Sequence, residues 1–321
     1  MDRRSCRLIV AVLACIGLHL APPAVRAAAF PDRPIRLIIG LTPGGAGDPI
    51  ARAAAEGMTR VLGQSVFVEH RPGAAGLLAA TAVANAHPDG YTLLVMSGAL
   101  PSSIATHKRY PLSLKDFVPL SNLAEIPFVI ASRYGSLAEF VRDGKSHPGK
   151  LDFGDNGLGS PGHLISEKFV MDAGLDVMRV HYKGSGETWQ ALLGGSVHVL
   201  FDTLTAGLAQ QSNGKVHLHA VSSAARSPMA PDIPTFAELG YPGVAASAWF
   251  GIAAPAGTPP EVLDKLERAI LAAGRDPAVR ARIQSVGAQP VFSDRATTSA
   301  KLQTELNLWT GVADALRIEI E

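Results

Sequence analysis

Two glycine-rich loops hold the residues of this sequence that could do chemistry, and that chemistry is the binding of an anion. The first loop, residues 41–48, follows an apolar strand at 35–39 and precedes a helical pattern at 50–62. We expect Asp48 to cap this helix and Pro49 to be its first residue. The backbone N–H groups and the helix dipole at such a turn can hold a carboxylate or a phosphate without Lys or Arg. Taken alone, the loop could equally be an ordinary connection between a strand and a helix.

The second loop lies between a strand predicted at 151–155 and a helix predicted at 162–173. Its segment Gly157-Leu158-Gly159-Ser160-Pro161-Gly162 matches the G-x-G-x-x-G fingerprint of dinucleotide-binding folds. However, no acidic residue that could bind a ribose ends the next strand, since Asp176 comes before that strand. An exported NAD(P)-dependent oxidoreductase is therefore the alternative function, while a carboxylate or a phosphate would suit the same loop.

The polar side chains near these loops indicate binding rather than catalysis. Ser160 is not in a nucleophile elbow, because Leu158 stands where that motif needs glycine, and we interpret Ser160 as a hydrogen-bond donor and helix cap. His163 lies on the same helical turn, where it could not easily act as the base for Ser160. Asp202 ends a predicted strand, so it could bind a ligand ammonium or hydroxyl, or it could cap the next helix. The sequence has no H-E-x-x-H motif, and we expect no catalytic residue, no metal and no cofactor.

The first 29 residues have the pattern of a secretory signal peptide. Arg3, Arg4 and Arg7 precede an apolar stretch at 8–20, and small residues around Ala27 fit a cleavage site. That stretch is too short to span a membrane, which takes about 20 apolar residues. We therefore expect a soluble, exported protein. A lipid attached at Cys15 is the alternative, and the exact cleavage site stays open.

Composition excludes several classes of function for the rest of the chain. Both cysteines, Cys6 and Cys15, lie in the leader, so no disulfide, thiolate nucleophile or cysteine zinc site is expected after cleavage. The leader holds four arginines and Asp2, which changes a net charge of +1 for the whole chain into one near −2 for the remainder. A nearly neutral chain without charge runs gives no electrostatic case for nucleic acid or for a membrane surface.

Strands and helices alternate through the remaining chain, which predicts an α/β fold with mostly parallel sheets. A chain of this length exceeds what one core usually organises, so two lobes are expected. The alternation resets at two strand-like passages, 120–132 and 249–254, which we interpret as hinge crossings. The predicted domains are the signal peptide at 1–29, lobe 1 at 30–126 plus 252–321, and lobe 2 at 127–251.

A series of collinear motifs resembles the solute-binding receptors of tripartite tricarboxylate transporters, the Bug family, along almost the whole chain after the leader. The motifs that carry the resemblance are Pro34-Ile35-Arg36-Leu37-Ile38, Pro43-Gly44-Gly45-Ala46-Gly47-Asp48, Glu69-His70-Arg71-Pro72-Gly73-Ala74-Ala75-Gly76, Pro88-Asp89-Gly90-Tyr91-Thr92-Leu93-Leu94, Pro148-Gly149-Lys150-Leu151, Gly162-His163-Leu164, Tyr182-Lys183-Gly184, Leu193-Gly194-Gly195, Phe201-Asp202, Trp249-Phe250-Gly251 and Ala254-Pro255-Ala256-Gly257-Thr258-Pro259.

The resemblance implies a two-lobed periplasmic binding protein of type II, a "Venus flytrap" with a ligand cleft between its lobes. It also implies capture of a small organic carboxylate, mainly by backbone groups, and delivery to the permease subunits of a membrane transporter. We expect a monomer, and a ligand sensor for a signalling partner is the alternative to a transport role. The ligand-binding positions carried over from the family are Thr42, Pro43, Gly44, Gly45, Ala46, Gly47, Asp48, Ser97, Gly159, Ser160, His163 and Asp202.

Four departures from the family pattern concern the first lobe. Gly47 stands where Thr or Asn is more usual, Thr42 where Pro is usual, His70 where Asn is usual, and Leu77 where Asn is often found. The loss of a hydroxyl at 47 and of an amide at 77 makes this side of the site less polar. The ligand is therefore expected to differ from the aspartate, glutamate or citrate bound by some relatives, and the sequence does not identify it.

Overall fold

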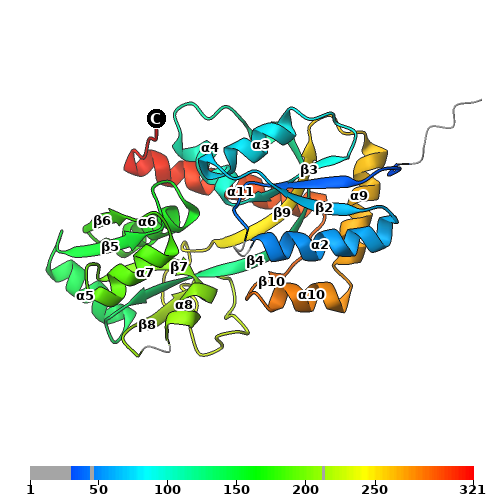
Figure 1. Cartoon of the computed structure of the whole chain (residues 1–321). Coiled ribbons are helices and arrows are strands. Elements are labelled where there is room, and N and C mark those ends of the chain that lie inside the picture. The colour runs from blue at the N-terminus through cyan, green and yellow to red at the C-terminus, as the bar shows by residue number, and fades with distance from the viewer. Residues whose placement is uncertain (1–29, 44–46, 212–213) are drawn as a thin grey trace, which may run out of the picture. The chain divides into compact units, whose positions relative to one another are not determined.

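The computed structural model describes residues 30–43, 47–211 and 214–321 (Figure 1). The predicted signal peptide and the loop residues Gly44, Gly45 and Ala46 lie outside the described residues. The chain divides into a short N-terminal unit, Met1–Asp32, and a large unit, Arg33–Glu321. Among the described residues, no helix is both long and apolar enough to cross a membrane.

The large unit is organised around one path of hydrogen-bonded strands, in the order β2-β1-β3-β9-β4-β7-β5-β6. We refer to the part from β2 to the start of β4 as the first half-sheet, and to the part from the end of β4 to β6 as the second half-sheet. The strands are β1 (Ile35–Ile39), β2 (Val66–His70), β3 (Thr92–Ser97), β4 (Phe117–Ser132), β5 (Leu151–Asp155), β6 (Val177–His181), β7 (Val199–Thr203), β8 (His217–Val221), β9 (Ser247–Pro255) and β10 (Gln289–Pro290).

The expectation of mostly parallel sheets is correct for the outer strands of each half-sheet and wrong at the centre. The neighbours of β1 are parallel to it, and so are those of β5. In contrast, β4 and β9 are antiparallel to each other and to their other partners. The reason is that β4 is 16 residues long, and it pairs with β9 up to Pro127 and with β7 and β8 from Phe128 onward. One strand thus belongs to both half-sheets.

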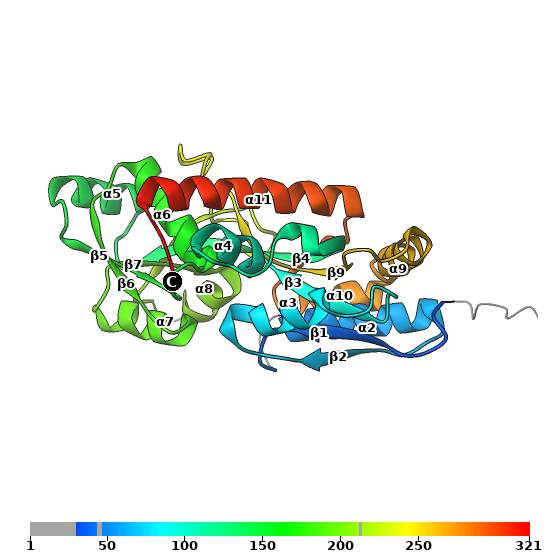
Figure 2. The same ribbon diagram turned by 90° about the horizontal axis from the view of Figure 1, so that it is seen from above.

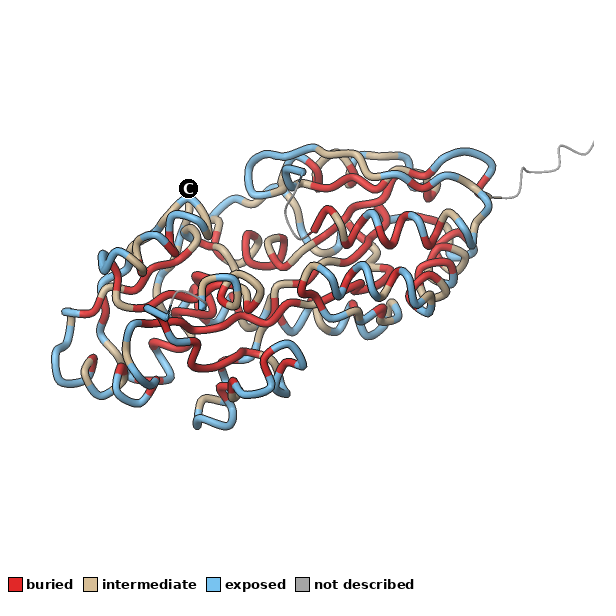
Figure 3. The backbone as a smooth tube through the Cα atoms, turned by 60° about the horizontal axis from the view of Figure 1, so that its bottom comes forward, coloured by how far each residue is buried: buried red, intermediate tan, exposed pale blue. Residues whose placement is uncertain are grey.

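Helices cover the faces of both half-sheets, and the buried residues, red in Figure 3, follow the strands between them. Strands such as Ile35–Ile39 form where apolar side chains are buried on both faces of the sheet. The helical segments are α2 (Gly47–Leu62), η1 (Ala74–Gly76), α3 (Leu77–Ala84), α4 (Ala99–Thr106), η2 (Leu114–Asp116), α5 (Leu137–Ser146), α6 (Pro161–Ala173), α7 (Ser185–Gly194), α8 (Leu204–Gln211), α9 (Pro260–Ala273), α10 (Pro277–Gln284) and α11 (Arg295–Leu316).

The long helix α11 contributes to the cores of both half-sheets (Figure 2). Leu302, near its start, packs with buried side chains of the first half-sheet. Trp309 and Val312, two to three turns later, pack among the phenylalanines of the second half-sheet. The lobe boundaries expected from the sequence therefore stay a prediction, because α4, α11 and the shared strand β4 connect the two halves.

Candidate functional site

The carboxyl ends of β1 and β3 bring the first glycine loop and Ser97 to the same edge of the sheet. These two strands are neighbours and parallel, with Ile39 opposite Val95. Strand β9 lies on the other side of β3, where Phe250 is opposite Ser97. A Cβ atom added at Gly47 would lie 2.7 Å from Cε1 of Phe250, so the start of α2 packs directly on this ring. Gly47, Ser97 and Phe250 therefore lie close together at this edge of the sheet.

The second glycine loop approaches this site from the other half-sheet. A Cβ atom added at Gly98 would lie 3.2 Å from Nε1 of Trp249 and 3.6 Å from Cγ of Pro161. Gly98 precedes α4, and Pro161 is the first residue of α6. The beginnings of two helices from different half-sheets thus meet beside Trp249. This arrangement brings Ser97 and Ser160, which the sequence analysis had singled out separately, to facing loops.

Ser160 caps helix α6, as the sequence predicts. Its Oγ accepts a hydrogen bond from the backbone N–H of His163 at 3.1 Å, and Pro161 occupies the first helical position. The hydroxyl keeps its own hydrogen for donation. A cap of this kind leaves Ser160 half-buried at the helix start and able to donate to an anion there.

His163 is buried and turned toward the protein that supports the second loop. Its Nδ1 accepts a hydrogen bond from the backbone N–H of Gly159 at 3.2 Å, and its Nε2 lies 3.5 Å from Oε1 of Glu167. Arg179 binds both carboxylate oxygens of Glu167 at 2.7 Å. Although burial opposes the charged form, the hydrogen bonds from Arg179 and His163 lower the pKa of Glu167 to about 2. His163 therefore holds Gly159 in place rather than facing the space between the loops.

One cluster among the described residues has the spacing of a metal site, namely Asp155, His163 and His181, whose candidate ligand atoms lie within 4.8 Å of one another. The groups of this cluster already bind protein atoms. Asp155 accepts a hydrogen bond from the N–H of Gly157 at 2.8 Å and contacts Nδ1 of His181 at 2.7 Å. With Nδ1 of His163 accepting from Gly159, the cluster fixes two glycines of the second loop.

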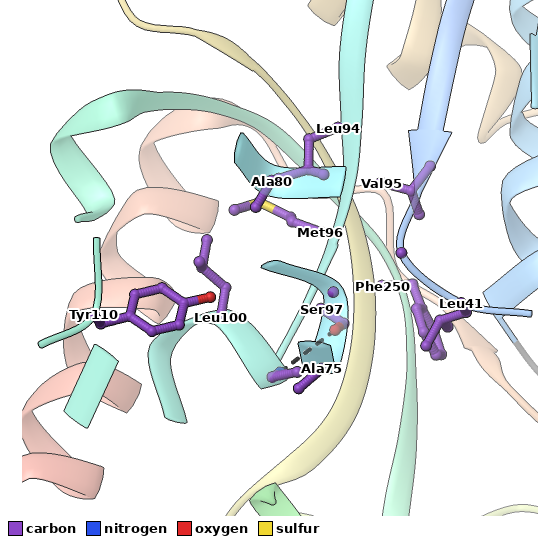
Figure 4. A pocket seen from close by; sticks show the side chains of 13 residues that line it. Leu41, Ala75, Ala80, Leu94, Val95, Met96, Ser97, Leu100, Tyr110 and Phe250 are labelled. Carbon is purple, nitrogen blue, oxygen red and sulfur yellow. Dashed lines mark hydrogen bonds between the residues drawn. The ribbon is translucent and has the colours of Figure 1, made fainter. Parts of the chain in front are cut away.

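A cavity opens beside Phe250 on the first half-sheet (Figure 4). It contains about 430 Å³ of space, part of which is open to solvent. Side chains of Leu41, Met96, Leu100 and Phe250 contribute apolar walls, and the side chain of Tyr110 approaches from the far side. Burial raises the pKa of the Tyr110 phenol, whereas a hydrogen bond with Ser103 opposes that shift. The phenol is therefore neutral at physiological pH.

The comparisons with known proteins agree with this architecture. Residues 50–318 match the family described as the tripartite tricarboxylate transporter family receptor, TctC. The chain belongs to this family. BugT of Bordetella pertussis is 35% identical over 94% of this chain and 96% of its own length. The fold is accordingly the two-lobed α/β fold of periplasmic solute-binding proteins.

Two solved structures of the same type carry organic acids. MatC (Rpa3494) from Rhodopseudomonas palustris with bound malate is 31% identical, with a TM-score of 0.74 over 88% of this chain and 99% of that chain. Rpa4515 from the same organism with adipate is 30% identical, with a TM-score of 0.75 over 89% of this chain and 97% of that chain. The matched family is one of receptors for transport.

The family positions in the first loop are only partly described. Gly44, Gly45 and Ala46 lie outside the described residues, whereas Thr42 and Pro43 are exposed before them. Asp48 lies inside α2, which begins at Gly47, so the predicted cap role for Asp48 is wrong. Its Oδ1 instead pairs with Nε of Arg52 at 2.9 Å and with Nε2 of His70 at 3.0 Å.

Asp202 is the most heavily engaged of the family positions. Its buried carboxylate accepts hydrogen bonds from Asn156 Nδ2 at 3.0 Å, Trp189 Nε1 at 2.7 Å and the Thr203 N–H at 2.7 Å, and also from the Ser185 hydroxyl. A ligand that bound Asp202 directly would have to displace one of these donors. The sequence predicted that Asp202 either binds a ligand or caps the next helix. It did not predict that other side chains would donate hydrogen bonds to this carboxylate.

Phe250 and Tyr110 are the site residues that sequence reasoning missed. From the sequence, Trp249-Phe250 was named only within a family motif and a hinge passage. Trp249 is buried in the core, where its Nε1 donates a hydrogen bond to Glu305 at 2.7 Å. Phe250 is the next residue on the strand, so it faces the opposite side of the sheet, toward Gly47. The alternation of side chains along β9 was the available signal. It became informative only once Ser97 was known to lie opposite Phe250.

Proposed function

We propose that this protein is an exported receptor that binds a small organic carboxylate between its two glycine loops and delivers it to the membrane subunits of a tripartite transporter. The observation that carries the proposal is the meeting of Ser97-Gly98 with Ser160-Pro161 beside Trp249. Two helix starts and two serine hydroxyls then offer N–H and O–H donors to the same anion.

Family membership supports the carboxylate part of this proposal. The malate and adipate structures show that relatives with the same fold hold acids of two different lengths. The leader pattern at residues 1–29 supports export to the periplasm, where such receptors meet their ligands. Delivery to a permease rests on family membership, and a sensor role would use the same ligand site.

An oxidoreductase role finds less support, because the space beside the second loop is already filled. A Cβ atom added at Gly159 would lie 2.5 Å from Cδ1 of Ile320 and 3.1 Å from Oγ1 of Thr106. In dinucleotide-binding folds a glycine at such a turn lets a pyrophosphate approach the backbone. Here a side chain from the end of the protein takes that space. We therefore propose a binding role and no catalytic activity.

The proposal is tested by thermal unfolding of the purified protein with a panel of acids: malate, succinate, glutamate, adipate, hexanoate, benzoate and terephthalate. A ligand that binds only the folded protein adds about 2.7 kcal/mol of stability at 100 times its dissociation constant. We expect at least one acid to raise the midpoint, and NAD to leave it unchanged. A panel without any shift, or a shift with NAD alone, would argue against a carboxylate receptor.

A further inference from the structure

The cavity beside Phe250 differs in chemistry from the loops that border it. None of its described lining residues carries a charge. Met96 and Leu100 are buried in its wall, and Leu41 lies at its edge with 37% of its surface exposed. In Figure 4, Met96 and Leu100 lie on one side of Ser97, and Leu41 and Phe250 lie on the other. A ligand seated at Ser97 would therefore have apolar surface next to it.

Two side-chain hydroxyls occur among the described residues that line the cavity, and only one of them is free to donate to a ligand. Ser97 Oγ accepts a hydrogen bond from the N–H of Ala99 at 3.4 Å, which leaves its hydrogen for another acceptor. The hydroxyl of Tyr110 is engaged with Ser103. The hydroxyl that can donate a hydrogen bond to a ligand is thus that of Ser97, beside the two helix starts. One ligand carboxylate can be bound there.

A second carboxylate inside the cavity would lack a counter-charge. The charged side chains that follow β1 and end β2 are paired with one another: Asp48 with Arg52 and His70, and Glu69 with Arg71 at 2.7 Å. A carboxylate removed from water without a cation or a full set of hydrogen bonds is strongly disfavoured, whereas a methylene chain or a ring gains from burial. The departure at Gly47 acts in the same direction, because it lets Phe250 pack against the start of α2.

We propose that this receptor prefers monocarboxylates with an aliphatic or aromatic body over dicarboxylates and hydroxy acids. The single carboxylate binds at the helix starts and Ser97, and the body lies against Leu41 and Phe250. This inference rests on the proposed function and narrows its substrate class.

Titration calorimetry with hexanoate and adipate tests the preference, because the two acids have the same carbon chain and differ only at its far end. We expect hexanoate to bind at least about 10-fold more tightly than adipate. The reason is that burial of an unpaired carboxylate raises the dissociation constant by more than about 10-fold. Benzoate and terephthalate form a second matched pair for an aromatic body, and a preference for benzoate supports the inference equally.

The outcomes separate this inference from the function on which it rests. The apolar preference would be overturned if any of the other acids bound as tightly as hexanoate or benzoate; these acids are adipate, terephthalate, malate and glutamate. Such a result would leave the carboxylate receptor function intact. Failure of every acid in the panel to bind would overturn the receptor function itself.

A charge placed at the cavity edge tests whether the apolar body lies there. In Leu41→Arg, a guanidinium could pair with the far carboxylate, so we expect the affinity of adipate relative to hexanoate to rise at least about 10-fold. Leu239→Arg is the matched control, because Leu239 is 40% exposed and does not line the cavity. The control should keep the wild-type ratio. An unchanged ratio in both variants would place the ligand body elsewhere and contradict the inference.

Discussion

The two glycine loops of this receptor are stabilised in different ways. In the second loop, Gly157 and Gly159 donate their N–H groups to Asp155 and His163, and further ion pairs stand behind these side chains. In the described part of the first loop, Nδ1 of His70 contacts the carbonyl oxygen of Leu41 at 2.8 Å, and Gly47 lies so close to the ring of Phe250 that no side chain would fit. The second loop is held by these polar bonds and does not contact the proposed ligand body. The first loop borders the apolar cavity in which that body is proposed to lie. This difference suggests that the second loop supplies general carboxylate binding and the first supplies selectivity.

The largest effect that would test this division is expected at Asp202. Asp202→Asn keeps the shape of the side chain but turns one acceptor toward Trp189 and Ser185 into a donor. We expect a loss of about 3 kcal/mol in unfolding free energy, because buried donors lose a charged acceptor. Urea unfolding measures this loss.

Asp152→Asn is the matched control, since Asp152 is partly exposed and pairs with His198 at 3.3 Å. It should change stability by less than about 1 kcal/mol. If Asp202→Asn unfolds like the wild type but reverses the preference between hexanoate and adipate, Asp202 is a selectivity residue. Selectivity would then not be a property of the first loop alone.

The next effect concerns affinity and the first loop. Gly47→Val adds a branched side chain where a Cβ atom alone would lie 2.7 Å from Phe250 and 2.8 Å from Cδ1 of Leu41. Overpacking of this kind costs about 1–3 kcal/mol of folding stability. Because the added side chain would displace the ring of Phe250 from the ligand site, we expect binding of the preferred acid to weaken about 30-fold. Calorimetry measures the affinity.

Gly311→Val serves as the comparison, because no atom beyond the neighbouring backbone of its own helix lies within 4 Å of the position a Cβ would take there. That variant should bind like the wild type. Unchanged affinity in Gly47→Val would mean that the contact with Phe250 does not shape the ligand site.

Much of the fold could be predicted because local signals and tertiary structure agree in it. The strands at 35–39 and 151–155 have the bounds expected from their apolar patterns, and the helix expected at 162–173 begins one residue earlier, at Pro161. The antiparallel centre could not be predicted, since the direction of β4 and β9 depends on partners more than 100 residues away in sequence. Helix α11 was assigned to one lobe because its pattern does not reveal that Leu302 and Trp309 enter different cores.

The site shows the same limit at the level of single residues. The cap role of Ser160 was predictable, because a serine before a proline at a helix start forms a local hydrogen bond. The roles of His163 and Asp202 were not, since their partners come from other elements and compete with a ligand for the same atoms. Phe250 was missed because its exposure depends on which side of β9 faces Gly47.

A smaller effect is expected at His163, whose role is to position Gly159. His163→Phe preserves the bulk but removes the Nδ1 acceptor, so the Gly159 N–H would lose its partner. We expect about 1–2 kcal/mol less stability and faster amide exchange in the second loop. Denaturant unfolding and hydrogen exchange measure the two effects. His163→Gln, which can still accept a hydrogen bond, should restore part of the protection. Equal exchange at Gly159 in the wild type and both variants would show that His163 does not hold the loop.

The smallest predicted effect is a pH dependence of stability that arises behind the second loop. The pKa of Glu167 is about 2 in the folded protein, below its ordinary value of 4.5, because Arg179 and His163 favour the carboxylate despite burial. The unfolded chain therefore takes up the proton first as the pH falls, and the stabilisation is complete above about pH 4.5 and lost toward pH 2.

Between pH 6 and pH 3 the wild type should lose on the order of 1 kcal/mol more of its unfolding free energy than Glu167→Gln, which has no carboxylate to titrate. Urea unfolding of both proteins at the two pH values gives this double difference. A double difference near zero for Glu167→Gln would mean that this ion pair does not stabilise the folded state, and the second loop would then depend on its uncharged hydrogen bonds alone.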